Sequence, residues 1–246
     1  MGTLFIVATP IGNLEDITIR AIKTLFSADI IACEDTRRTG LLLQGLTKRY
    51  TGMEGSHTST SKPWKYANLL RVDEHTEQQN VPKLIDALTH GRTVALVSDA
   101  GTPLVSDPGF LLVREAIKRG IKVVSVPGPT AAIAALTSSG LPTDKFFFLG
   151  YPPEKSSHRI KLFDSLLILN RFKISTTYIL YCAPHKLEQT LEDMKNVFGD
   201  IEIVVARELT KVYEEVWRST ITNAESHFVN PKGEFVILFN PMKERV

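Results

Sequence analysis

Residues able to bind a polar ligand are concentrated in the segment Val94–Gly109, where an apolar run is followed by Ser, Asp, Gly, Thr and Pro. The apolar run is typical of a fully buried strand, and Phe110–Arg119 has the spacing of a helix. Open α/β sheets bind ligands at such places, outside the carboxyl ends of their strands. Asp99 lies there beside Ala100 and Gly101, which are small enough for a ligand to approach the backbone. We therefore expect a ligand-binding loop, although an ordinary strand-to-helix turn remains the alternative.

Similar polar or Gly/Pro turns follow the other strands predicted in the first half of the chain. These turns are Thr9-Pro-Ile-Gly12, Cys33-Glu-Asp35, Asp73-Glu-His75 and Pro127-Gly-Pro129. Because the carboxyl ends of parallel strands meet at one edge of a sheet, we expect the turns to lie together on one rim.

The elements that must position these turns alternate between strand and helix. The strands are predicted at 3–8, 30–33, 69–72, 93–98 and 122–126, and the helices at 17–26, 36–46, 81–88, 110–119 and 130–136. Asp16 is the expected N-cap of the first helix, and Thr36 or Thr39 starts the second. Strictly alternating elements predict a mostly parallel sheet with crossover helices.

The second half has a different pattern and predicts a mixed sheet. Strands are expected at 146–150, 177–182, 201–206, 213–219 and 234–239, with a basic amphipathic helix at 155–171 and another helix ending at Phe198. The fold class is therefore α/β with two domains, residues 1–127 and 128–246. Residues 48–63, rich in Ser, Thr and Gly, interrupt the pattern and are expected to form a surface loop.

Composition narrows the class of protein. The 246 residues are 43% hydrophobic and 23% charged, which is typical of a globular protein, and no apolar run approaches a membrane span. The apolar N-terminus is interpreted as a strand, not a signal peptide. Two cysteines suggest no disulfide framework, so a reducing cytoplasm is expected. A net charge of +2 is too small to indicate nucleic-acid binding, so any RNA contact requires a local basic patch.

Several kinds of chemistry have no motif in this chain. It contains no G-x-x-x-x-G-K-[ST] phosphate loop, no G-x-S-x-G nucleophile elbow, no H-E-x-x-H and no G-x-G-x-x-G. The six histidines are not paired at the spacing of metal ligands, so no metal is expected. Carboxylates and backbone groups at the rim suit a ligand with amine, hydroxyl and adenine edges better than a polyphosphate.

Taken together and in order, the motifs resemble the tetrapyrrole (corrin/porphyrin) methylase superfamily, and more narrowly its ribosomal RNA branch, the small-subunit 2′-O-ribose methyltransferases of type I. The resemblance covers nearly the whole chain. It is carried by Thr9-Pro-Ile-Gly-Asn-Leu-Glu-Asp16, Glu34-Asp-Thr-Arg-Arg-Thr39, Ser98-Asp-Ala-Gly-Thr-Pro103, Asp107-Pro-Gly109, Pro127-Gly-Pro129, Ser139-Gly-Leu-Pro-Thr-Asp144, Ala206-Arg-Glu-Leu-Thr-Lys211 and Lys232-Gly-Glu-Phe235.

The resemblance implies two stacked α/β domains with S-adenosyl-L-methionine (SAM) in the cleft between them, in a homodimer. It implies methyl transfer to the 2′-hydroxyl of a cytidine in the decoding region of 16S rRNA, within the small ribosomal subunit. The cofactor-binding residues implied by position are Pro10, Ser98, Asp99, Ala100, Gly101, Thr102, Thr130, Ala131, Cys182, Arg207 and Gly233.

A ribose hydroxyl is a poor nucleophile, so a base or a cation that favours the alkoxide would assist the transfer. The candidates are Lys211, Glu34, Asp35 and Glu208, although these charged segments are equally well interpreted as ion pairs. Candidate phosphate-contacting residues are Arg20, Arg37, Arg38, Lys48 and Arg49, followed by Lys62 and Lys65. Trp64 and Tyr66 are candidates for stacking on a flipped or unpaired base, although anchoring of the loop is an equally good interpretation of these aromatics.

Three other functions remain open from the sequence. A member of the same superfamily could methylate a carbon of a corrin or porphyrin ring, but it would need an apolar trough, whereas this rim carries arginines and carboxylates. A non-catalytic RNA-binding relative would have kept the fold without binding SAM. A phosphohydrolase of doubly wound fold is the third alternative, and the lack of metal-ligand motifs argues against it.

Overall fold

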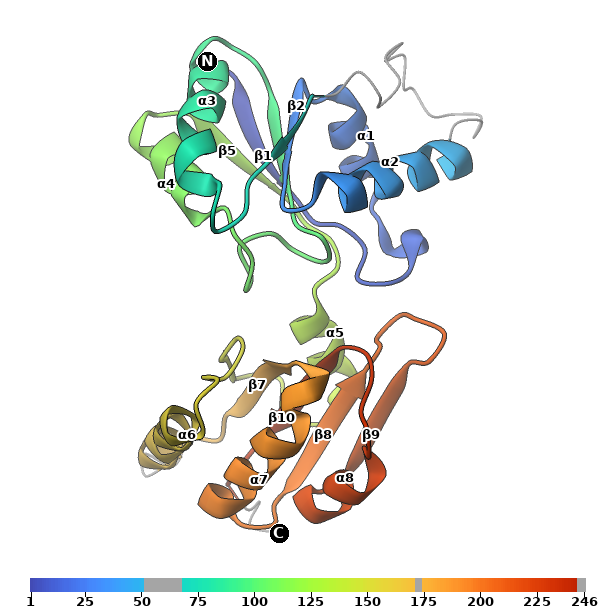
Figure 1. Ribbon diagram of the computed structural model, residues 1–246, viewed down its shortest axis with the longest axis vertical. Helices are drawn as coiled ribbons and strands as arrows, with labels where there is room; N and C mark the ends of the chain where they lie inside the picture. The colour runs from blue at the N-terminus through green and yellow to red at the C-terminus, as the bar shows by residue number, and fades with distance from the viewer. Residues whose placement is uncertain (51–67, 171–173, 243–246) are drawn as a thin grey trace. The chain divides into compact units, whose positions relative to one another are not determined.

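The computed structural model describes residues 1–50, 68–170 and 174–242, and the chain divides into two compact units, Met1–Thr130 and Ala131–Val246 (Figure 1). The sequence placed this division after Pro127. Each unit contains one sheet with its own helices, so the predicted α/β class is confirmed.

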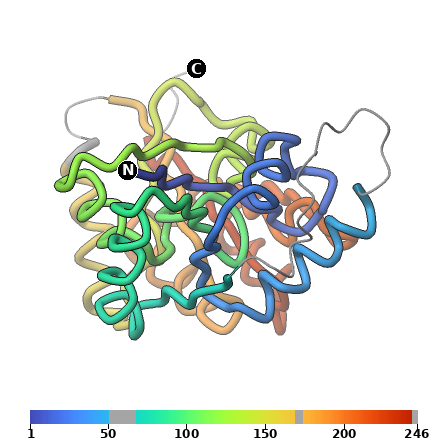
Figure 2. The backbone as a smooth tube through the Cα atoms, turned by 90° about the horizontal axis from the view of Figure 1, so that it is seen from above, coloured from blue at the N-terminus to red at the C-terminus, as the bar shows by residue number. Residues whose placement is uncertain are grey.

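The first unit is built on a five-stranded sheet in the order β3-β2-β4-β1-β5, and every neighbouring pair is parallel. In Figures 1 and 2 the chain starts in this sheet with β1, drawn in dark blue. Every residue of the short strands β2 and β4 is buried, as expected where helices cover both faces of a parallel sheet. The strands are β1 (Thr3–Val7), β2 (Ile30–Cys33), β3 (Asn68–Arg71), β4 (Val94–Val97) and β5 (Lys122–Val126).

Helices cover both faces of the first sheet (Figure 1). One face packs Leu25 of α1 and Leu43 of α2 against Val97 of β4. The other packs Leu84 of α3 and Leu112 of α4 against the same sheet. The helices are α1 (Ile19–Ser27), α2 (Thr36–Tyr50), α3 (Glu77–Thr89) and α4 (Phe110–Lys118).

The start of the first helix differs from the prediction. Asp16 ends a short 3-10 helix (Leu14–Asp16), and Thr18 is the N-cap of α1 because its hydroxyl accepts a hydrogen bond from the Ala21 N–H. Asp16 was therefore the wrong cap. Thr18, two residues later, also has a side-chain oxygen that can accept a hydrogen bond from the first turn of the helix, and it is the residue that caps α1.

The second unit has a mixed sheet in the order β6-β7-β10-β8-β9, in which only β6 and β7 are parallel. Helices α6, α7 and α8 pack through Phe163, Leu191 and Ile221 into one core, and α5 also contacts this sheet. The strands are β6 (Phe146–Phe148), β7 (Thr177–Cys182), β8 (Glu202–Arg207), β9 (Glu215–Thr220) and β10 (Phe235–Phe239).

The helices of the second unit are α5 (Ala131–Ser139), α6 (Ser156–Asn170), α7 (Leu187–Phe198), which follows a 3-10 turn at Pro184–Lys186, and α8 (Ile221–His227). The sequence did not predict α8. It spans only two turns, too few to show a helical period, and it begins where the Thr220 hydroxyl accepts a hydrogen bond from the Asn223 N–H.

Candidate functional site

The loops that follow the five strands of the first unit form what we call the first rim: residues 8–13, 34–35, 72–76, 98–109 and 127–130. Because all five strands are parallel, the loops lie at one edge of the sheet, as predicted. Thr9 and Gly101 exchange two backbone hydrogen bonds of 2.8 and 3.0 Å, joining the loops after β1 and β4. The Thr102 hydroxyl donates to the Pro129 carbonyl at 3.0 Å, which joins the loop after β5. Most of the implied cofactor residues are therefore neighbours.

The backbone approaches itself closely at two glycines of the first rim. A Cβ on Gly128 would lie 2.9 Å from the Ala8 Cβ, closer than side chains normally pack. Gly101 has a φ of +86°, a left-handed conformation that favours glycine, and its Cα faces the Ile11 side chain. Because of this close packing, the backbones of Thr9–Pro10 and Gly101–Thr102 lie side by side.

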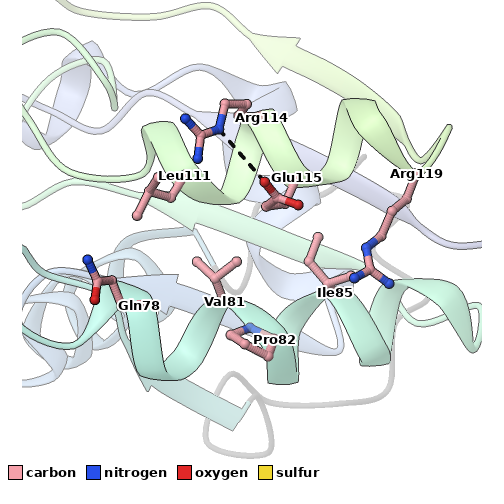
Figure 3. Close-up of a pocket in the computed structure, with 8 residues that line it drawn as sticks. All are labelled: Gln78, Val81, Pro82, Ile85, Leu111, Arg114, Glu115 and Arg119. Carbon is pink, nitrogen blue, oxygen red and sulfur yellow. Dashed lines mark ion pairs between the residues drawn. The ribbon is translucent and has the colours of Figure 1, made fainter.

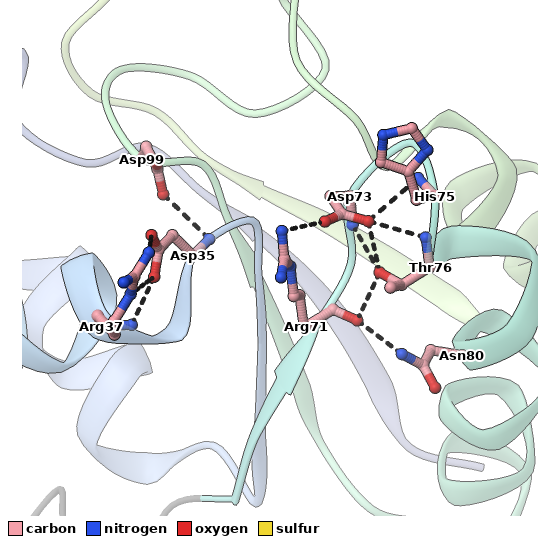
Figure 4. Close-up of polar contacts among 8 residues, drawn as sticks. All are labelled: Asp35, Arg37, Arg71, Asp73, His75, Thr76, Asn80 and Asp99. Atoms are coloured by element: carbon pink, nitrogen blue, oxygen red, sulfur yellow. Dashed lines mark hydrogen bonds and ion pairs between the residues drawn. The ribbon is translucent and has the colours of Figure 1, made fainter.

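Asp99 is the central side chain of the first rim. Its Oδ1 accepts a hydrogen bond from the Asp35 N–H at 3.2 Å (Figure 4), and its Oδ2 lies 3.3 Å from an Arg38 guanidinium nitrogen. Burial raises the pKa of the Asp99 carboxyl, and these two partners only partly oppose the shift. The loops after β2 and β4, separated by 64 residues, are thus joined through one carboxylate.

Further carboxylates lie close enough to influence one another. Burial, together with the charge of Asp99, raises the pKa of Glu34. Burial raises the pKa of Asp107 to about 6, with the charges of Glu34 and Asp99 adding to the effect and a hydrogen bond from Ser98 opposing it. The sequence showed Asp107 only as part of a turn, because nothing local indicated its burial.

Asp73 has a structural role at the same rim. Figure 4 shows its Oδ1 accepting from the N–H groups of His75 and Thr76 and from the Thr76 hydroxyl, and Arg71 pairs with its other oxygen at 2.6 Å. These contacts begin α3, and the Asn80 side chain donates to the Arg71 carbonyl. The Thr76 hydrogen bond is the main cause of a lowered pKa for Asp73.

Three of the implied cofactor residues of the second unit, Cys182, Arg207 and Gly233, also share one edge, which we call the second edge, while Ala131 begins α5. Phe235 of β10 is paired with Cys182 of β7 on one side and with Arg207 of β8 on the other. The Cys182 side chain is buried in the core, and burial raises the pKa of its thiol to about 11. The Cys182 side chain is therefore not available to a ligand.

Arg207 and Gly233 hold the loops of this edge together. The Arg207 Nε–H donates to the Lys232 carbonyl at 2.8 Å, and the guanidinium lies over the Phe235 ring. A Cβ on Gly233 would lie 2.6 Å from the Glu208 side chain, and Gly233 has a φ of +96°. Gly233 is thus needed for the position of Glu208.

The candidate proton acceptors differ in their environments. The guanidinium of Arg37, hydrogen-bonded to Asp35, lowers the pKa of Asp35 to about 2, which makes this partly exposed carboxylate a weak base. Lys211 lies 2.9 Å from a Glu208 oxygen and 3.0 Å from a Glu234 oxygen. Burial of Lys211 opposes protonation, but the two glutamates outweigh it and raise its pKa.

Glu208 is a charged partner in the same group of residues. Burial raises its pKa, but the hydrogen bonds from Lys211 and from the Glu234 N–H are together stronger and lower it. Glu208 and Lys211 therefore fit the alternative interpretation of the segment Arg207–Lys211, in which its charged residues form ion pairs. Glu34 differs, because no hydrogen bond or ion pair to its carboxylate is found within the described part of the chain.

Five of the candidate RNA-contacting residues lie in the described part of the chain, and four of these five are on α2. Arg37 and Arg38 are in its first turn, beside the first rim, and their side chains are 88% and 69% exposed. Lys48 and Arg49 are in its last turn, where Arg49 pairs with Glu15 of the 3-10 helix Leu14–Asp16. The fifth, Arg20, is exposed on α1. Lys62, Trp64, Lys65 and Tyr66 lie outside the described residues.

A cavity of about 390 Å³ lies between α3 and α4 of the first unit (Figure 3). Val81, Ile85 and Leu111 form its apolar wall, and Arg114, paired with Glu115, lies at its margin. None of the predicted site residues lines it.

The described ranges contain no group of three or more His, Cys, Asp and Glu side chains arranged to hold a metal ion. Within the same ranges, no helix has both the length and the apolar character needed to cross a membrane.

Comparisons with known proteins place the chain in a family. Residues 3–225 match the family described as Tetrapyrrole (Corrin/Porphyrin) Methylases. A protein of Halalkalibacterium halodurans named ribosomal RNA small subunit methyltransferase I is 43% identical over 248 residues, which cover 100% of this chain and 78% of the relative. The protein of the same name from Thermotoga maritima is 41% identical, with 98% of this chain and 99% of the relative covered.

Solved structures share the fold at low sequence identity. The methyltransferase CobJ has a TM-score of 0.65 at 18% identity, with 100% of this chain and 97% of that chain covered. A uroporphyrin-III C-methyltransferase from Thermus thermophilus, complexed with S-adenosylhomocysteine, has a TM-score of 0.60 at 15% identity, with 96% and 97% covered. The chain belongs to the tetrapyrrole (corrin/porphyrin) methylase family, in the group of relatives named ribosomal RNA small subunit methyltransferase I.

Proposed function

We propose that this protein is a SAM-dependent methyltransferase that modifies the ribose 2′-hydroxyl of a cytidine in the decoding region of 16S rRNA. The observation that carries the proposal is the full-length similarity, at 41–43% identity, to relatives named ribosomal RNA small subunit methyltransferase I. The protein acts on the small ribosomal subunit in the cytoplasm, as a homodimer.

The residues of the first rim fit SAM by their chemistry. The charge of Asp99 raises the pKa of Glu34, and the charges of Asp99 and Glu34 raise the pKa of Asp107, so these carboxylates repel one another. A bound polyphosphate would add to the repulsion. A ligand with a cationic sulfonium, an ammonium group and ribose hydroxyls relieves it. The closely packed backbone at Gly101 and Gly128 provides a surface against which such a ligand can lie.

The proposed cofactor contacts come from the loops of both units. The first unit supplies Pro10, Ser98, Asp99, Ala100, Gly101, Thr102 and Thr130, and the second supplies Ala131, the backbone of Cys182, Arg207 and Gly233. Asp99 has the leading role, because its carboxylate is held in place by Asp35 and Arg38 yet keeps a raised pKa that a cationic ligand would lower.

SAM, when bound, supplies an electrophilic methyl group on a sulfonium, so the protein contributes position, exclusion of water and control of a proton. Of the candidate residues, Glu34 is the proposed proton acceptor. Its raised pKa makes it a stronger base than Asp35, and Glu208 is occupied by Lys211. Lys211 is held protonated by Glu208 and Glu234, which raise its pKa, so it is not the proton acceptor.

RNA phosphates are proposed to contact α2 and α1. Arg37 and Arg38 extend from the α2 turn that follows Glu34–Asp35, while Lys48 and Arg49 lie at the other end of the helix. The 15 residues of α2 span about 22 Å, which covers several phosphates along one strand. Arg20 of α1 belongs to the same proposed contact surface.

The deciding experiment incubates the protein with labelled SAM and 30S particles that lack ribose methylation, and then maps the modified nucleotide. A ribose 2′-O-methyl group on a cytidine of the decoding region is expected. Labelling of a base, or of a tetrapyrrole acceptor but not of 30S particles, would contradict the proposal. RNA binding without SAM binding in calorimetry would instead indicate a non-catalytic relative.

Asp99→Ala tests the cofactor site in the same assays. We expect the variant to remain folded by circular dichroism but to lose most of its SAM affinity, at least about tenfold, because a charge-assisted contact is removed. Asp86→Ala is the matched control, since Asp86 is an exposed carboxylate on α3 of the same unit, away from the first rim. Equal SAM affinity in the two variants would remove Asp99 from the proposed site.

A further inference from the structure

The loop between β8 and β9, residues 208–214, is held in place by several backbone hydrogen bonds and ion pairs. The Glu208 N–H donates to the Glu234 carbonyl, and the Glu234 N–H donates back to the Glu208 carboxylate, both at 3.0 Å. The Lys211 ammonium bridges the carboxylates of these same two glutamates. The Glu214 carboxylate accepts a hydrogen bond from the Thr210 N–H and thereby closes the loop from its other end.

This loop is also strained. Glu208 and Thr210 have φ values of +49° and +66°, a left-handed conformation that non-glycine residues, and β-branched ones above all, rarely adopt. The buried hydroxyl oxygen of Thr210 has no hydrogen-bond partner among the described residues. Strained backbone and an unsatisfied polar atom persist where the surroundings enforce them, and they concentrate at ligand-binding sites.

Between these contacts, the tip of the loop has two exposed side chains. Val212 is 93% exposed and Tyr213 is 76% exposed, between the anchored residues Lys211 and Glu214. Lys211 N–H donates to the Glu208 carbonyl and Glu214 N–H donates to the Lys211 carbonyl, so the backbone on each side of the tip is tied down. These backbone hydrogen bonds reduce the conformational entropy that the loop would lose when the tip binds a partner.

The charges of the loop indicate which kind of partner fits. Lys211, the one cation of residues 208–214, is neutralised by Glu208 and Glu234, so the loop itself offers no unpaired cation to a phosphate. A tip of two residues is far smaller than the 20–30 residues per partner of a stable protein interface. An exposed aromatic ring on a loop that has no unpaired cation of its own is suited to stacking on a nucleobase, which is how proteins commonly recognise unpaired RNA.

The loop begins at the second edge, where β8 ends at Arg207, the residue paired in register with Phe235 and one of the proposed cofactor contacts. We propose that the Val212–Tyr213 tip is a substrate-recognition element, in which Tyr213 stacks on an unpaired base of the RNA next to the nucleotide that is methylated. The inference rests on the proposed function and adds the residue that recognises the single-stranded character of the substrate.

Tyr213→Ala, Tyr213→Phe and Tyr213→Trp are compared with the wild type in methylation of unmethylated 30S particles, with SAM affinity measured by calorimetry. Loss of stacking is expected to raise KM for 30S particles about tenfold in Tyr213→Ala, while the aromatic variants stay within about threefold of the wild type. SAM affinity is expected to be unchanged in all three variants. Phe110→Ala is the matched control, since Phe110 is an aromatic residue with 63% exposure in the other unit.

Wild-type kinetics in Tyr213→Ala, or an equal loss in Phe110→Ala, would overturn the proposal. A change in oligomeric state by sedimentation would overturn it in favour of contact with a second copy, and a loss of SAM affinity in favour of a structural role. Binding of 30S particles is measured in the same samples with S-adenosylhomocysteine present. If the wild type binds but does not methylate, the proposed function fails, whereas weaker binding of Tyr213→Ala alone still supports the stacking contact.

Discussion

At the scale of single residues, the first rim is unusual in keeping carboxylates where they are hard to ionise. Asp99 and Glu34 are half-buried neighbours, and Asp107 has a pKa of about 6. A carboxyl pKa that is strongly shifted by burial together with a nearby charge is common in functional sites. The second edge shows the opposite behaviour, because Glu208 and Lys211 stabilise one another's charges.

The raised pKa of Asp107 predicts a pH-dependent cost to stability. The folded state holds this proton more tightly than the unfolded state, so the wild type loses stability as pH rises from the usual value near 3.8 through about 6. Asp107→Asn, which cannot ionise, should therefore be more stable than the wild type at pH 7.5 by about 1 kcal/mol, after allowing for solvent screening.

This difference is measured from urea unfolding midpoints at pH 7.5 and pH 4. At the lower pH the two proteins should converge, because Asp107 is protonated in the folded wild type. A difference of the same size at both pH values would show that the substitution acts through packing and not through the charge.

At the scale of elements, helices α6 and α7 are joined by a buried ion pair. The Arg159 side chain is 1% exposed, and its guanidinium lies 2.6 Å from an Asp193 oxygen while donating to the carbonyls of Pro153 and Glu154. Ser156 also donates to Asp193. The basic helix expected at 155–171 therefore places one of its cations in the interior instead of on a solvated face.

Breaking this pair should cost far more than breaking a surface pair. Asp193→Asn leaves the buried Arg159 charge uncompensated, and we expect a loss of about 3–5 kcal/mol in the free energy of unfolding by urea. Lys145→Met removes an exposed pair with Asp144 in the same unit and should cost no more than about 1 kcal/mol. Similar losses in both variants would mean that the buried position of Arg159 does not decide its contribution.

At the scale of the whole molecule, each unit has its own hydrophobic core. The cluster around Phe163, Tyr178 and Phe239 contains residues of the second unit alone, while those around Leu84 and Leu43 contain residues of the first. Each strand-end loop is thus supported by the core of its own unit, and the proposed cofactor contacts depend on two cores.

Because the two units have separate cores, a cavity made in the core of one unit should destabilise that unit and leave the other unchanged. Phe163→Ala removes a fully buried ring that contacts Phe198, at a cost of about 3–5 kcal/mol. Native-state hydrogen exchange should then show weaker protection of the amides of β7, β8 and β10, with β1 and β4 unchanged. Equal loss of protection in both units would show that they unfold as one cooperative body.

The sequence by itself determined the kinds of elements, their order and the chemistry at their ends. Alternation of strands and helices, the turn residues after each strand and the motif around Asp99 are local properties, and local periodicity and turn chemistry are enough to predict them. The family could be predicted for the same reason, since its motifs are short segments in a fixed order. Local rules did less well at Thr18, where two capping residues competed, and at α8, which is too short to show a period.

Only the tertiary structure decided which of these residues meet and in what environment. The strand order places β2 beside β4, which allows the Asp35 N–H to reach Asp99 across 64 residues of sequence. Antiparallel register places Cys182 and Arg207 on either side of Phe235. The pKa of Asp107 and the exposure of Tyr213 also depend on residues distant along the chain. Burial and charge act through space, so no local pattern contains them.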